Sequence, residues 1–147
     1  MQDQSAQLFT LFVEIGKINQ LSRALMDARL PGEMISTHFS VLNHLVQVQD
    51  GRTPLDLARA FQVPKTSMTH TLSGLEKAGL VVTKSNPADG RSKLVWITEK
   101  GRRFRQDAIS DLVPQVEHLL SEIDASKLEE TIAYLAIVRR VLDNSRA

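Results

Sequence analysis

Residues 55–79 read LDLARAFQVPKTSMTHTLSGLEKAG, and their pattern is the most informative in the chain. Apolar residues recur at three- and four-residue spacing on both sides of Gln62-Val63-Pro64, which predicts a short helix over 55–61 and a longer one over 65–78. Gly79 is well placed to end the longer helix in a left-handed cap. Two helices joined by so tight a turn are typical of a helix-turn-helix, whose second helix lies in the major groove of DNA.

A hairpin is predicted directly after these helices. Residues 80–84 and 93–97 are rich in branched apolar side chains, and the segment 85–92 between them is dense in turn formers. The pattern indicates two strands joined by a long tip. A helix-turn-helix followed by such a hairpin, here over residues 53–100, is a winged helix-turn-helix, and the wing can reach the neighbouring minor groove.

Two helices are predicted before this winged part. Apolar residues recur at helical spacing from Leu8 onward, and the pattern ends near Leu30-Pro31-Gly32. Ser36 or Thr37 can cap a second helix, which ends before Asp50-Gly51.

Two further helices follow the winged part. Thr98 is a good N-cap for a helix that continues towards Leu120, and Pro114 is expected to kink that helix because its ring removes a backbone donor. The last helix is predicted to begin near Asp124 or at the capping-box pattern of residues 126–129. The expected fold class is therefore mostly α (α+β), with one small hairpin sheet.

The first and last helical regions, residues 1–30 and 102–147, carry more apolar surface than a small winged domain can cover. We expect them to be dimerisation helices that pack two copies of the chain together in an isologous interface. A self-contained helical cap is the alternative. A homodimer of this kind would read a pseudo-palindromic duplex with half-sites about 10 base pairs apart.

Charge is segregated along the chain, although the net charge is only +1. Residues 52–105 contain eleven basic and four acidic side chains, a net charge of +7, so the rest of the chain carries −6. Such segregation is expected when one face meets phosphates. No stretch has the roughly 18 apolar residues needed to cross a membrane, and the N-terminus lacks a signal-peptide pattern, so we expect a cytoplasmic protein.

One face of the longer helix of the helix-turn-helix is short, polar and basic. Met68, Leu72 and Leu75 recur on the opposite face and are expected to pack on the core. The polar face can place hydroxyl, imidazole and ammonium groups on base edges and phosphates. Its predicted DNA-binding residues are Lys65, Thr66, Ser67, Thr69, His70 and Ser73.

Three residues of the hairpin tip extend this predicted DNA surface. Arg91 has the reach and the flat guanidinium suited to the narrow minor groove, and Lys93 would lie near phosphates. Asp89 could hold Arg91 by a charge-assisted hydrogen bond. In the alternative, Asp89-Gly90 only makes the turn and Arg91 stays in solvent.

Four segments resemble the MarR family of bacterial transcription regulators. They are Leu57-Ala58, the run TLSGLEKAGLV at 71–81, DGRS at 89–92 and ITEKG at 97–101. The helix order on either side is similar as well, so the resemblance covers nearly the whole chain as a single MarR-type domain. It implies a homodimeric DNA-binding regulator, usually a repressor and often released from DNA by a small aromatic or phenolic ligand. By the same likeness the helix from Lys65 is the recognition helix, and Arg91 is the wing arginine with Asp89 as its partner.

Two positions depart from the family's pattern. Gln62 stands where such a turn often has glycine, so either Gln62 adopts a strained positive φ or the turn takes another shape. Pro64 replaces the usual hydroxyl cap, which removes one capping bond. Candidate ligand-binding residues follow from location alone, at the junction of the dimer helices and the winged part; they are Phe12, Met34, His38, Phe39 and His44.

Other functions fit the sequence less well. The chain has no cysteine and its four histidines are scattered, which argues against a metal-responsive regulator. No catalytic signature or phosphate loop is present, so we expect no enzyme, and no cofactor or metal is expected. A winged-helix protein-interaction module without DNA binding is the remaining alternative, because a fold does not fix a function.

Overall fold

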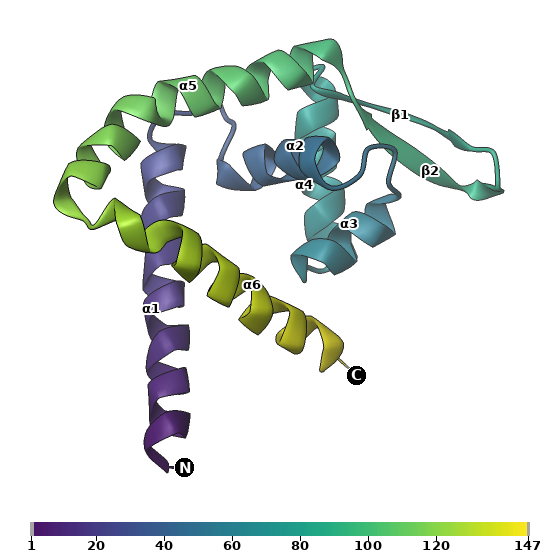
Figure 1. The fold of residues 1–147 in the computed structure, drawn as a ribbon. Helices are drawn as coiled ribbons and strands as arrows, with labels where there is room; N and C mark the ends of the chain where they lie inside the picture. The colour runs from purple at the N-terminus through teal and green to yellow at the C-terminus, as the bar shows by residue number, and fades with distance from the viewer. Residues whose placement is uncertain (1, 147) are drawn as a thin grey trace. The chain divides into compact units, whose positions relative to one another are not determined.

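The computed structural model describes residues 2–146, and its ribbon is drawn in Figure 1. The chain forms two compact units, one up to Asp111 and one from Leu112. The predicted mostly helical fold with a two-stranded wing is confirmed. In chain order the elements are α1 (Gln2–Asp27), α2 (Ser36–Gln47), α3 (Pro54–Phe61), α4 (Lys65–Lys77), β1 (Val81–Asn86), β2 (Asp89–Ile97), α5 (Glu99–Glu122), the 3-10 turn η1 (Ala125–Lys127) and α6 (Leu128–Asn144).

The core of the first unit lies between α2, α3, α4 and the root of the wing. Its fully buried side chains come from all four: Val41, Leu42, Leu45, Leu57, Met68, Leu75, Leu80 and Val95. The predicted inner face of α4 is confirmed, since Met68, Leu72 and Leu75 are all buried. Apolar burial of this kind holds α4 in place and leaves its opposite face to solvent.

The turn between α3 and α4 adopts the strained form. Gln62 has φ 55° and ψ 43°, a left-handed conformation that glycine would adopt without steric cost. Pro64 occupies the N-cap of α4 and makes no side-chain capping bond, as expected. At the other end of α4, Gly79 has φ +75°, which confirms the left-handed cap.

The wing is longer than the sequence suggested. Strands β1 and β2 pair antiparallel from Val81 with Ile97, and the tip predicted over 85–92 is mostly strand. That prediction was wrong because side chains close the tip. Asn86 Oδ1 accepts from the Ala88 amide at 3.0 Å, and Asn86 Nδ2 donates to Ser92 Oγ at 3.0 Å. These local bonds reduce the turn to two residues.

The expected caps of α2 are also wrong. The N-cap residue is Ile35, whose amide donates to Nδ1 of His38 at 3.0 Å. The hydroxyls of Ser36 and Thr37 instead accept from the Arg23 guanidinium, at 3.1 and 3.0 Å. They therefore link α2 to α1 rather than cap α2. Helix α1 itself ends at Asp27, three residues before the predicted position.

Helix α5 begins as predicted, because Thr98 Oγ1 accepts from the Gly101 amide at 3.0 Å. The helix continues past Pro114 to Glu122. In the second unit Asp124 caps the 3-10 turn by accepting from the Ser126 amide at 3.0 Å, and α6 then starts at Leu128. Within residues 2–146, no helix combines the length and apolar character that a bilayer span requires.

Candidate nucleic-acid interface

The polar face of α4 is fully presented to solvent. All six residues predicted on it, from Lys65 to Ser73, are exposed, whereas the face opposite is buried. The exposed six are Lys65, Thr66, Ser67, Thr69, His70 and Ser73. Small hydroxyls, one imidazole and one ammonium group therefore share a surface that a groove can approach closely.

Helix α4 also packs against α2, through Gly74. A Cβ added at Gly74 would lie 3.0 Å from Nε2 of His38, so the imidazole packs directly on the α4 backbone. Burial, and to a lesser degree the nearby charge of His70, lowers the pKa of His38. The neutral ring that results keeps Nδ1 available as the acceptor at the start of α2.

The tip of the wing carries the three predicted residues, and all are exposed: Asp89, Arg91 and Lys93. The contact between the first two differs from the expected one. Asp89 Oδ1 accepts from the backbone amide of Arg91 at 3.0 Å, and within residues 2–146 no ion pair joins the carboxylate to the Arg91 guanidinium. An aspartate two residues before an amide favours this Asx-type bond, which leaves the guanidinium directed by the strand alone.

The root of the wing is held by Asp50, Arg52 and Arg102, a role that no sequence pattern indicated. Asp50 Oδ1 accepts from the amides of Gly51 and Ile97 at 2.9 and 3.0 Å, and Arg102 lies 3.3 Å from Oδ2. The Arg52 carbonyl accepts from the Val95 amide at 2.8 Å. In the sequence, Asp50-Gly51 signalled only the end of a helix. We call residues 50–52 the wing tether.

His44 joins the wing tether to α2. Its Nε2 lies 3.0 Å from the Arg52 guanidinium, and its ring packs on Phe61 with 5.4 Å between ring centroids. Burial, and then the charge of Arg52, lowers the pKa of His44. A neutral imidazole can accept the hydrogen bond from Arg52, whereas a protonated one would repel it.

The candidate ligand residues serve different contacts. His38 and His44 are engaged as described, Phe39 is half-buried, and Phe12 on α1 is 36% exposed. Met34 lines a cavity of about 490 Å³ together with Lys77 and Phe104. Among residues 2–146 no three histidine or carboxylate side chains lie close enough together to hold a metal ion.

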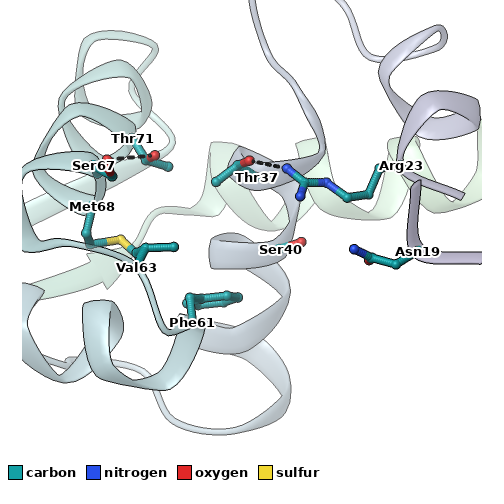
Figure 2. Close-up of a pocket in the computed structure, with 9 residues that line it drawn as sticks. All are labelled: Asn19, Arg23, Thr37, Ser40, Phe61, Val63, Ser67, Met68 and Thr71. Atoms are coloured by element: carbon teal, nitrogen blue, oxygen red, sulfur yellow. Dashed lines mark hydrogen bonds between the residues drawn. The ribbon is translucent and has the colours of Figure 1, made fainter. Parts of the chain in front are cut away.

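A second cavity, of about 260 Å³, lies between α1, α2 and the start of α4 (Figure 2). The Arg23 guanidinium lies on one side, where it donates to Thr37, and the apolar Phe61, Val63 and Met68 lie across from it. Asn19, Ser40, Ser67 and Thr71 complete the lining. Its polar groups come from three separate helices, so no local sequence pattern marked it.

Comparison with known proteins extends these observations. Residues 34–92 match the MarR family. The chain is similar to the solved transcriptional regulator BldR from Sulfolobus solfataricus, with 26% identity over 91% of this chain and 95% of that one and a TM-score of 0.79. A mutant MarR from E. coli, solved with operator DNA, is 25% identical over 92% of this chain and 96% of that one, with a TM-score of 0.72.

A third similar structure was solved with a small molecule. The PcaV transcriptional regulator from Streptomyces coelicolor, in complex with its natural ligand, is 22% identical over 90% of this chain and 91% of that one, with a TM-score of 0.68. These likenesses confirm the resemblance that the four sequence segments predicted.

Proposed function

We propose that this MarR-type winged-helix protein regulates transcription by binding duplex DNA. The observation that carries the proposal is the α4 face: six polar or basic side chains are exposed on a helix whose other face is fully packed. Arg91 and Lys93 on the wing add cationic groups with the reach to contact a minor groove and phosphates. The similar E. coli protein was solved on operator DNA, which supports the same partner here.

We propose that the chain acts as a homodimer through residues 1–30 and 102–147. Helix α6 has no buried residue, and Ile132, Ile137 and Val141 on it are about half exposed or more. On α1, Phe9 and Leu21 are each 71% exposed. Apolar surface of this extent favours an isologous interface with a second copy, which would pair two α4 helices on a pseudo-palindromic site.

Selection of bound genomic fragments tests DNA recognition. The full chain should enrich fragments that share an inverted repeat, with half-site centres about 10 base pairs apart, because two recognition helices of a two-fold dimer face one side of the duplex. Sequencing of the retained DNA is the measurement. Lys65→Glu should abolish enrichment, while Lys127→Glu, an equal charge reversal on the exposed η1, should leave it intact. No enrichment by the unmodified chain would favour a protein-interaction module instead.

We further propose that the protein is a repressor that a small aromatic or phenolic anion releases from DNA. The cavity in Figure 2 supports this, since it offers Arg23 for the anion and an apolar wall for a ring. It also borders the first turn of α4 at Ser67. A ligand there can shift DNA binding only by its differential affinity for the two shapes of the protein. The five positions named from sequence stay a prediction.

Titration with salicylate, followed by calorimetry, tests this release. We expect salicylate to bind and to weaken DNA binding, and Arg23→Met to weaken salicylate binding about tenfold or more, because a charge-assisted bond is lost. Arg23→Lys should retain part of the affinity. Arg29→Met is the matched control, since Arg29 contacts the Leu25 carbonyl and does not line the cavity. Equal affinity in Arg23→Met would exclude this cavity as the site.

A further inference from the structure

We propose that Asp50 is a positioning residue for DNA binding: it holds the root of the wing in place and so orients Arg91 toward the duplex, without contacting DNA itself. The inference rests on the proposed function. It assigns to the wing tether, residues 50–52, a role that neither the polar face of α4 nor the wing tip supplies.

Asp50 joins three separate parts of the first unit through one carboxylate. It accepts from its own loop at the Gly51 amide, from the last residue of β2 at the Ile97 amide, and from α5 at Arg102. Only 23% of its side chain is exposed. Ile97 is itself buried, so without Asp50 its amide would lose its partner.

Gly51 and Arg52 continue the same attachment along β2. A Cβ added at Gly51 would lie 2.5 Å from the Trp96 ring, which shows that the indole packs on the Gly51 backbone, and Gly51 has φ +66°. Arg52 forms an antiparallel bridge with Val95. One edge of β2 is therefore held by β1 and the other by the wing tether.

The tip of the wing depends on this root. Figure 1 shows the hairpin extending away from the helices beside it. From Ile97 to Arg91 the strand spans about 20 Å, at about 3.3 Å per residue. A rotation of about 10° at the root would then move Arg91 by roughly 3 Å, comparable with a whole hydrogen-bond length. On the other strand, Thr83 donates to Glu76 at 3.0 Å, which links β1 to α4.

The direction in which DNA affinity changes when Asp50 is replaced distinguishes a positioning role from a purely electrostatic one. Asp50→Ala removes a negative charge directly beside the basic residues 52–105, which by charge alone would strengthen binding to phosphates. If Asp50 positions the wing, the same substitution should weaken DNA binding, because Arg91 would no longer be held where it can contact the duplex. Glu33→Ala, which removes the same charge from an exposed site in the loop between α1 and α2, outside the proposed dimerisation segments, is the matched control and should not weaken binding.

A double-mutant cycle on a selected DNA fragment, read by fluorescence anisotropy, tests the inference. We expect Asp50→Ala and Arg91→Ala each to weaken binding about tenfold or more, and the double variant to bind about as weakly as either one, because both changes remove the same contact. Ser67→Ala on α4 should weaken DNA binding by the same factor whether or not Asp50 is also replaced by alanine. Asp50→Asn keeps an acceptor for the two amides and should lose less.

Trp96 supplies a readout that needs no DNA, since it is the only tryptophan of the chain. Asp50→Ala should make its fluorescence more accessible to acrylamide, while circular dichroism shows the helices retained. Two results would overturn the inference. Asp50→Ala could bind DNA with unchanged affinity, or the affinity loss of the double variant could equal the product of the losses in Asp50→Ala and Arg91→Ala. If the unmodified chain binds no DNA, the proposed function fails instead, and unchanged Trp96 quenching would then reject the tether by itself.

Discussion

Raising the salt concentration from about 50 mM to about 200 mM should weaken DNA binding by about a thousandfold or more. The expectation follows from the charge distribution. Residues 52–105 carry a net +7, and Lys65, Arg91 and Lys93 are all exposed on the proposed DNA face. A dimer that neutralises about six phosphates releases the ions condensed on them, which sets a slope near −5 in a plot of log affinity against log salt.

Anisotropy titrations of a selected fragment at four or five salt concentrations give that slope. Lys65→Gln should reduce its magnitude by about 2 per dimer, because each protomer loses about one phosphate contact. The control is Lys17→Gln on α1, which lies outside the basic part of the chain and should leave the slope unchanged. A flat salt dependence of the unmodified protein would contradict phosphate binding as the source of affinity.

The winged part was predictable because its signals are local. The apolar spacing on either side of Gln62 placed α3 and α4 within one or two residues, and the same spacing separated the buried face of α4 from its exposed one. Thr98 likewise caps α5 where a hydroxyl before a charged first turn predicts it. In each case the residue that decides the structure acts on its own helix.

The features that were predicted wrongly or not at all depend on contacts between different elements. Ser36 and Thr37 were predicted to cap α2, but their hydroxyls accept hydrogen bonds from Arg23 on α1. Asp50 looked like a helix end, yet its carboxylate bonds Ile97, which lies 47 residues away. The cavity in Figure 2 combines side chains from four helices, α1 to α4. Such contacts depend on tertiary packing, and a single sequence carries no period or motif that records them.

Gly101→Ala should lower the free energy of unfolding by about 3 kcal/mol or more. By helix propensity alone the change would stabilise α5 by about 1 kcal/mol. Packing reverses the sign, because the added Cβ would lie 2.1 Å from the Leu80 carbonyl oxygen and 2.8 Å from the Ile97 side chain. That carbonyl cannot retreat freely, since it accepts from the Thr98 amide at 3.1 Å.

Urea unfolding followed by circular dichroism measures this loss, and Gly90→Ala is the matched control. A Cβ at Gly90 meets nothing within 4 Å and its φ is not positive, so that variant should stay within about 0.5 kcal/mol of the unmodified chain. Equal stability of the two variants would show that α5 can shift away from Leu80. Because the Ile97 amide donates to Asp50, any shift that accommodates the methyl group should disturb the root of the wing. DNA affinity should therefore fall in Gly101→Ala even where the chain remains folded.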